Sequence, residues 1–145
     1  MSTPIQEFQT YSPEETIIAG KELALQLKPG DIVCLSGDLG AGKTHFTKGI
    51  AQAFGVNTEE VSSPTYSIIQ EYGHSQHRIY HIDAYRLKSE QEALDIGLDE
   101  ILTGNDIYVI EWPERIRDLI GLNYWSVSLE HANDHQRTIR INHHI

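Results

Sequence analysis

DIVCLSGDLGAGKT, residues 31–44, is the stretch of sequence that decides the fold. Its first part is a short apolar run, Ile32 to Leu35, which predicts a buried strand. Its second part is a glycine-rich loop of the form GxxxxGKT. After Lys43 apolar residues recur at helical spacing as far as Phe54. A strand, a glycine loop and a helix in this order predict a phosphate-binding loop of the Walker A type, here called the P-loop.

Each residue type of the P-loop suits a bound triphosphate. The glycines let several backbone N–H groups turn toward an anion, and the helix that follows directs its positive end at the same place. The lysine reaches the β- and γ-phosphates, and the threonine hydroxyl faces Mg²⁺. No Asn-Lys-x-Asp segment typical of guanine binders occurs, so we expect ATP. The predicted nucleotide-binding residues here are Gly37, Asp38, Leu39, Gly40, Ala41, Gly42, Lys43, Thr44 and His45.

Two acidic residues follow apolar runs. Glu111 comes after Ile107-Tyr108-Val109-Ile110, and Asp83 after Ile79-Tyr80-His81-Ile82. A P-loop enzyme needs such an acid at the end of a neighbouring strand, to hold the metal directly or through water. For Asp83 three roles stay open: metal ligand, orientation of the attacking water, or the cap of a turn. We expect Lys43, Asp83 and Glu111 to be catalytic.

Two further residues are candidates for the same site. Thr65 lies in the loop Ser62-Ser63-Pro64-Thr65, where switch loops place a hydroxyl near the γ-phosphate. Trp112, directly after Glu111, packs against the nucleotide or belongs to the core, and the sequence does not decide between these. The predicted metal ligands are therefore Thr44, Thr65, Asp83 and Glu111.

The rest of the chain predicts one α/β domain over residues 1–145. Capping boxes at Ser12 and Ser89 start helices, the first expected to run to Leu27. Ile107 to Ile110 reads as a buried strand, and four more strand-like runs are present. They are Tyr66 to Tyr72 with Arg78 to Asp83, as a hairpin, and Trp125 to Leu129 with Thr138 to Asn142. We expect a single P-loop domain with a mixed, largely parallel central sheet flanked by helices, whose strand order the sequence does not give.

Composition narrows the function classes. The formal net charge of −10 repels phosphate backbones, so we expect no direct binding of DNA, and of tRNA only through a partner. The single cysteine, Cys34, lies in an apolar run and is expected to be a buried thiol. The N-terminus lacks the pattern of a signal peptide, and we expect a cytoplasmic protein without a membrane span.

Four motifs together resemble the bacterial TsaE (YjeE) family. They are Gly-Asp-Leu-Gly-Ala-Gly-Lys-Thr at 37–44, Ser-Pro-Thr-Tyr at 63–66, His-Ile-Asp-Ala-Tyr-Arg-Leu at 81–87 and Ile-Glu-Trp-Pro at 110–113. The resemblance extends over essentially the whole chain. It implies a Mg-dependent ATPase needed for threonylcarbamoyladenosine (t6A) in tRNAs that read codons beginning with adenine. It further implies the partners TsaB and TsaD, and resetting of the complex rather than threonylcarbamoyl transfer. Because the sequence offers no convincing arginine finger, we expect hydrolysis to be slow in the isolated chain and faster with these partners.

The resemblance also assigns roles residue by residue. Lys43 and Thr44 match the family's ligands of phosphate and Mg²⁺, and Glu111 matches its Walker B acid. The other matches are Asp83 to the aspartate that helps hydrolysis, Thr65 to the hydroxyl near the metal, and Trp112 to the tryptophan beside the nucleotide. His45 and Tyr66 depart from the residues usual in the family, which leaves nucleotide affinity open.

Two other function classes remain open. A small-molecule kinase needs an acceptor pocket and a lid with arginines, and only Arg115 and Arg117 cluster here. A binding module that senses ATP without hydrolysing it is favoured if Asp83 and Glu111 lie away from the γ-phosphate. Phosphotransfer assays separate the first from an ATPase, and the positions of the two carboxylates bear on the second.

Overall fold

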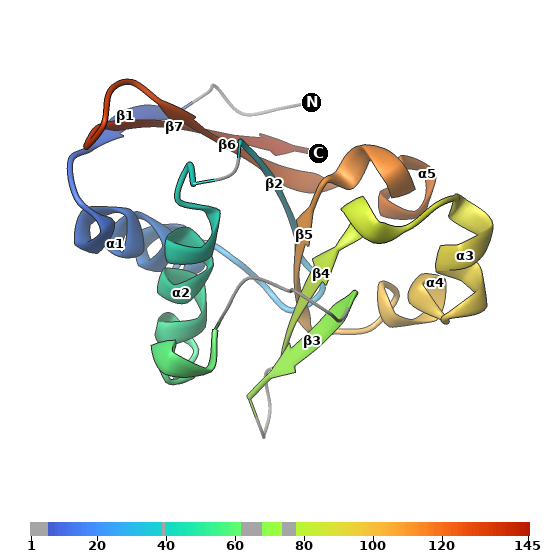
Figure 1. Cartoon of the computed structure of the whole chain (residues 1–145). Coiled ribbons are helices and arrows are strands. Elements are labelled where there is room, and N and C mark those ends of the chain that lie inside the picture. Colours follow the sequence, from blue (N-terminus) through green and yellow to red (C-terminus); the bar gives the residue numbers. More distant parts are fainter. Residues whose placement is uncertain (1–5, 39, 62–67, 74–77) are drawn as a thin grey trace.

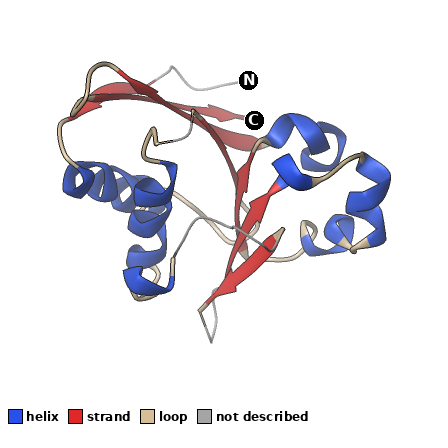
Figure 2. Cartoon of the chain, in the orientation of Figure 1, coloured by secondary structure: helices blue, strands red, loops and turns tan. Residues whose placement is uncertain are grey.

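A seven-stranded sheet runs through the molecule, with helices on both of its faces (Figures 1 and 2). The computed structural model describes residues 6–38, 40–61, 68–73 and 78–145. The order of the strands across the sheet is β1-β7-β6-β2-β5-β4-β3. The strands are β1 Gln6–Thr10, β2 Ile32–Ser36, β3 Ile69–Tyr72, β4 Ile79–Asp83, β5 Ile107–Glu111, β6 Tyr124–His131 and β7 Arg137–His144.

The centre of the sheet is parallel and its edges are antiparallel. Strand β2 pairs in parallel with β5 on one side and with β6 on the other, and β4 pairs in parallel with β5. Strands β3, β7 and β1 add antiparallel pairs at the two edges. This arrangement confirms the predicted α/β class with a mixed sheet. It brings the carboxyl ends of β2, β4 and β5 to one edge, where ligands of such sheets bind.

The helices divide between the two faces. Helices α1 (Pro13–Ala24) and α2 (Lys43–Ala53) cover one face, and the short helices α3, α4 and α5 cover the other (Figure 1). The remaining helical segments are α3 Glu90–Asp95, α4 Leu98–Ile101, α5 Arg117–Ile120 and the 3₁₀ turns η1 Thr58–Glu60, η2 Ala84–Arg86 and η3 Pro113–Ile116. None of the described helices has the length and apolar character that crossing a membrane requires.

The predicted helix starts are confirmed by their caps. The Glu15 N–H donates to Ser12 Oγ at 3.1 Å, and the Glu92 N–H donates to Ser89 Oγ at 3.2 Å. Each bond satisfies one of the N–H groups that a helix start leaves without a partner. The first helix ends at Ala24 rather than at Leu27, where the chain turns toward β2.

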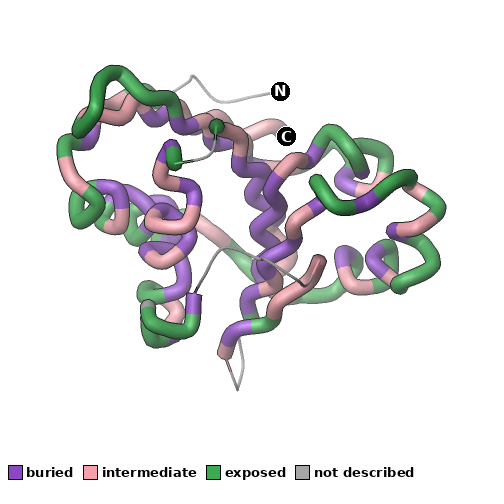
Figure 3. The backbone as a smooth tube through the Cα atoms, in the orientation of Figure 1, coloured by how far each residue is buried: buried purple, intermediate pink, exposed green. Residues whose placement is uncertain are grey.

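A separate hydrophobic core lies on each face of the sheet. The central strands between the two cores are largely buried (Figure 3). The core on the side of α1 and α2 contains the fully buried side chains of Leu35 from β2 and of Phe46 and Ile50 from α2. The opposite core holds Tyr108 and Ile110 from β5 with Leu98 from α4. Alternate residues of β5 thus enter different cores, which is why the strand reads as a continuous apolar run.

Helices α1 and α2 pack closely against each other at two glycines. A Cβ added at Gly49 would overlap the carbonyl oxygen of Ile17, and one at Gly20 would overlap that of Phe46. We expect Gly49→Ala to force the helices apart and lower the free energy of unfolding by about 1–3 kcal/mol. Urea titration measures this, with exposed Gln52→Ala on the same helix as control. Equal midpoints for the two variants would show that the helix pair is not tightly packed.

Some elements differ from the sequence prediction. Strand β1 was not predicted, because QEFQT has little β-branched content, and it exists through its pairing with β7 over Gln6 to Thr10. Strands β6 and β7 are longer than predicted because they pair with each other along their whole lengths, Tyr124–His131 with Arg137–His144. The two strands of the predicted hairpin are β3 and β4, while its turn lies outside the described residues. Cys34 is buried as expected, and burial raises the pKa of its thiol to about 12.

Candidate active site

The P-loop joins the end of β2 to the start of α2. Gly37, Gly40 and Gly42 all have positive φ, and a Cβ at Gly37 would lie 2.5 Å from the Leu129 carbonyl oxygen. Glycine is therefore required there by both conformation and space. Gly42 is the N-cap of α2 and Lys43 its first residue, so the helix N-terminus faces the loop as predicted for a phosphate site.

Lys43 lies at the centre of the site. Its side chain is largely buried, with Nζ 3.5 Å from Glu111 Oε1 and 4.7 Å from the centroid of the Trp112 ring. The lysine thus has a carboxylate on one side and an aromatic face on another. Three residues that the sequence proposed separately are in contact here.

The second oxygen of Glu111 is bound to a histidine. His81 Nε2 lies 2.6 Å from Glu111 Oε2, and His81 Nδ1 lies 3.1 Å from the Tyr72 hydroxyl. Burial by itself raises the pKa of the Glu111 carboxyl. The hydrogen bond and charge of His81, together with Lys43, outweigh burial and lower that pKa. Glu111 is therefore an ionised carboxylate inside the protein.

Asp83 stands next to Glu111 and also caps a turn. The two residues are register partners at the ends of β4 and β5. Asp83 Oδ1 accepts the Tyr85 N–H at 3.1 Å, and Oδ2 lies 3.8 Å from Arg86 Nε. The capping role that the sequence left open is present. The end of β4 also keeps the Asp83 carboxylate at the edge of the sheet where β2 ends and the P-loop begins.

Trp112 is held beside Lys43 by an unusual backbone. Among the described residues it is the one non-glycine with positive φ, 59°. Left-handed backbone is costly for a bulky residue and is found where the surrounding structure imposes it, often at functional sites. The Tyr85 ring lies 5.1 Å from the Trp112 ring, and Arg115 lies 5.6 Å from Tyr85. Trp112 therefore lies beside the P-loop lysine and is a member of neither core.

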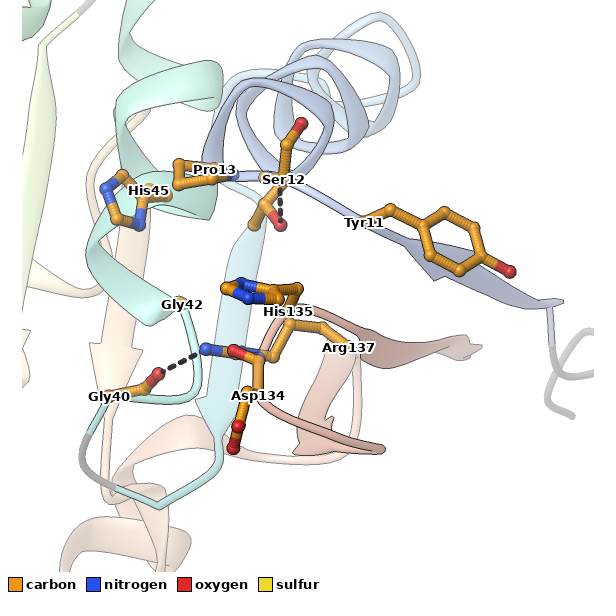
Figure 4. Close-up of a pocket in the computed structure, with 10 residues that line it drawn as sticks. Tyr11, Ser12, Pro13, Gly40, Gly42, His45, Asp134, His135 and Arg137 are labelled. Atoms are coloured by element: carbon orange, nitrogen blue, oxygen red, sulfur yellow. Dashed lines mark hydrogen bonds between the residues drawn. The ribbon is translucent and has the colours of Figure 1, made fainter.

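A cavity of about 150 Å³ adjoins the other side of the P-loop (Figure 4). Ser12 and Pro13 from the start of α1 form one wall, His45 from α2 another, and the turn between β6 and β7 a third. Arg137 lines it and donates from Nη2 to the Gly40 carbonyl at 3.2 Å (Figure 4). Its Nη1 donates to the Asn133 and Asp134 carbonyls. Arg137 thus ties the cavity wall to the P-loop.

The predicted site residues are brought together except where the structure does not describe them. Lys43, Asp83, Glu111 and Trp112 line one edge, with Thr44 beside Lys43 in the first turn of α2. Leu39 and Thr65 lie outside the described residues. The remaining predicted residues, Asp38, Ala41 and His45, are on the P-loop or the first turn of α2.

Sequence reasoning missed His81 and Tyr72 as partners of the site. Alternation along β4 puts His81 on the same face as Asp83, which was the available signal. Contact with Glu111 depends on the pairing of β4 with β5, which one strand alone does not show. Arg137 was missed because its contact with Gly40 joins residues 97 positions apart.

The oxygen donors suit Mg²⁺ better than a transition metal. Among the described residues no group of three or more His, Cys, Asp or Glu side chains is arranged to hold a metal by itself. Magnesium usually takes one or two protein oxygens and completes its shell with phosphate and water. Thr44, Asp83 and Glu111 at the mouth of the P-loop fit that mode.

Comparison with known proteins identifies the family. The profile described as "Threonylcarbamoyl adenosine biosynthesis protein TsaE" matches residues 10–139. The chain belongs to the TsaE family. The P-loop, the His81 to Leu87 segment and the Glu111-Trp112 pair all lie within the matched range, so the resemblance noted from the four motifs is confirmed.

Individual TsaE relatives align over most of the chain. The TsaE protein of Bacillus subtilis is 41% identical over 133 residues, covering 92% of this chain and 82% of the relative. That of Rickettsia conorii is 44% identical over 130 residues, covering 90% and 74%. Both carry the description "tRNA threonylcarbamoyladenosine biosynthesis protein TsaE". The crystal structure of YdiB from Bacillus subtilis superposes with a TM-score of 0.80 at 33% identity, covering all of this chain and 88% of YdiB.

Proposed function

We propose that this chain binds Mg-ATP in the P-loop and hydrolyses it during t6A modification of tRNA. The observation that carries the proposal is the buried contact of Lys43 with Glu111 at the mouth of the P-loop. A lysine from the loop and an acid from the neighbouring strand are the two side chains that P-loop hydrolysis requires. Membership of the TsaE family supports the same activity.

The residues divide the work by their chemistry. Lys43 leaves Glu111 for the β- and γ-phosphates, where its charge is better compensated. Thr44, with Asp83 and Glu111 directly or through water, would hold Mg²⁺, which neutralises charge on the phosphates. A carboxylate at this edge also orients the attacking water. Trp112 covers the lysine side of the site and shields it from solvent.

The cavity beside the P-loop is the proposed place for the nucleoside. It adjoins Gly40 and Gly42, so a triphosphate held by the loop has room on that side for its sugar and base. The imidazoles of His45 and His135 offer planar surfaces for stacking. Burial lowers the pKa of His45, and nearby Lys48 adds to this, which favours the neutral ring.

The biological role follows from the relatives. The relatives from Bacillus subtilis and Rickettsia conorii are named as t6A biosynthesis proteins, and we infer that this chain serves the same pathway with the partners TsaB and TsaD. The net charge of −10 disfavours direct contact with tRNA. We propose that the chain acts in the cytoplasm as an ATPase that resets the complex, and not as the threonylcarbamoyl transferase.

The first test is thermal stabilisation by the nucleotide. A ligand at about 100 times its dissociation constant adds roughly 2.7 kcal/mol to the native state. Saturating Mg-ATP is therefore expected to raise the melting temperature, and GTP to raise it less. Differential scanning fluorimetry measures both, with ATP in excess EDTA as the metal control. An equal or larger shift with GTP would contradict the assignment to ATP.

The two acids are expected to serve hydrolysis more than folding. Glu111→Gln and Asp83→Asn remove the charge but keep the shape, and we expect each to slow hydrolysis by about 10²-fold or more. Single-turnover phosphate release gives the rate, and urea titration gives the stability. Exposed Glu114→Gln on η3 is the control. Unchanged rates together with lost stability would make the two acids structural.

A further inference from the structure

A buried row of polar side chains, each in contact with the next, extends from β3 at the edge of the sheet to the P-loop lysine. The Tyr72 hydroxyl contacts His81 Nδ1, His81 Nε2 contacts Glu111 Oε2, and Glu111 Oε1 contacts Lys43 Nζ, at 3.1, 2.6 and 3.5 Å. His81 is fully buried, and Tyr72, Lys43 and Glu111 are 5%, 7% and 6% exposed. The Tyr72 hydroxyl in turn donates to Gln70 Oε1.

The central hydrogen bond joins an imidazole nitrogen to a carboxylate oxygen. A carboxylate accepts hydrogen bonds, so the His81 tautomer with a proton on Nε2 is the one that donates to Glu111 Oε2. His81 belongs to β4 and Glu111 to the adjacent strand β5, and the two strands pair in parallel from Ile79 to Asp83. The bond therefore fixes the rotation of the carboxylate relative to the P-loop.

Nucleotide binding makes this bond more important. When Lys43 turns to the phosphates, Glu111 Oε1 loses the lysine. His81 is then the side chain that the structure shows still bound to the Glu111 carboxylate. A carboxylate that is buried and held on one oxygen keeps the other oxygen in a defined direction toward the site.

We propose that His81 is a positioning residue, which orients Glu111 for the hydrolytic step and has little effect on nucleotide binding. The inference rests on the proposed ATPase function and adds to it a residue outside the P-loop. The alternative is a histidine that only fills the core and satisfies its own hydrogen bonds. The two readings differ in whether the effect of His81 passes through Glu111.

A double-mutant cycle on the full chain tests the proposal. Single-turnover hydrolysis, with protein in excess over Mg-ATP, gives the rate and the half-saturating concentration for His81→Leu, Glu111→Gln and the double variant. We expect His81→Leu to lower the rate by about 10- to 100-fold and to change half-saturation by less than about threefold. Adding it to Glu111→Gln is expected to cause no further loss. If the rate losses of the two single variants multiply in the double variant, the proposal is wrong. It is also wrong if His81→Leu changes only the half-saturating concentration of Mg-ATP.

Two more variants keep the test decisive. His81→Gln presents an amide N–H where Nε2 stands and is expected to recover part of the rate lost in His81→Leu; no recovery counts against the proposal. If circular dichroism shows that His81→Leu is unfolded, the same cycle is run with Tyr72→Phe, which removes only the hydroxyl behind His81. Tyr72→Phe is expected to slow hydrolysis severalfold in the chain with native Glu111 and to have no further effect in Glu111→Gln. The proposal is wrong if Tyr72→Phe leaves the rate unchanged, or if its loss multiplies with that of Glu111→Gln.

The wild-type chain separates the two levels of inference. If it binds and hydrolyses Mg-ATP but the cycle shows independent effects, the role of His81 is wrong and the ATPase function stands. If the wild type shows no hydrolysis alone or with TsaB and TsaD, the proposed function fails and the role of His81 fails with it.

Discussion

Lys43→Ala is expected to abolish ATP binding at millimolar concentrations. The P-loop backbone would then face a triphosphate without its main cationic side chain, and charge-assisted bonds to phosphate are the strongest that such a site makes. The substitution has a second effect, because Lys43 also contacts buried Glu111. Without the lysine, Glu111 keeps its bond to His81 but no longer has a cation between it and the loop, so its negative charge repels the phosphates.

Isothermal titration calorimetry with Mg-ATP measures the effect. Lys21→Ala on α1 is the matched control, since it removes one exposed lysine from outside the site. Circular dichroism checks that both variants keep the fold. Binding by Lys43→Ala with unchanged affinity would rule out the P-loop as the nucleotide site.

TsaB and TsaD together are expected to accelerate ATP hydrolysis by this chain. In the described part of the chain, the arginines near the site are already engaged. Arg86 faces Asp83, Arg115 donates to the Leu87 carbonyl, and Arg137 donates to backbone carbonyls that include Gly40. A partner that supplies an arginine to such a site raises hydrolysis by about 10³- to 10⁵-fold.

Steady-state phosphate release is measured for the chain alone, with tRNA, with TsaB and TsaD, and with all components. The acidic chain should gain nothing from tRNA alone. Equal stimulation by tRNA alone and by the full mixture would contradict activation through the partners. Many rounds of t6A formation without any stimulated hydrolysis would contradict the resetting role.

The sequence predicted the P-loop unit because its signals are local. An apolar run, three glycines and a helical repeat lie within residues 31–54, and each depends on neighbours along the chain. The caps at Ser12 and Ser89 were predictable for the same reason, since a cap needs only the three residues that follow it. Strand β1 was not, because its stability comes from β7, more than a hundred residues away.

The candidate site shows the same division. The sequence by itself predicted a phosphate loop around Lys43 and showed that Asp83 and Glu111 follow apolar, strand-like runs. It also determined the family, through four motifs in order. Only the tertiary structure decided that β5 and β4 follow β2 in the sheet, which places Glu111 between Lys43 and His81. Strand order and cross-strand contacts depend on the packing of residues distant in sequence, and local periodicity carries no information about which strands become neighbours.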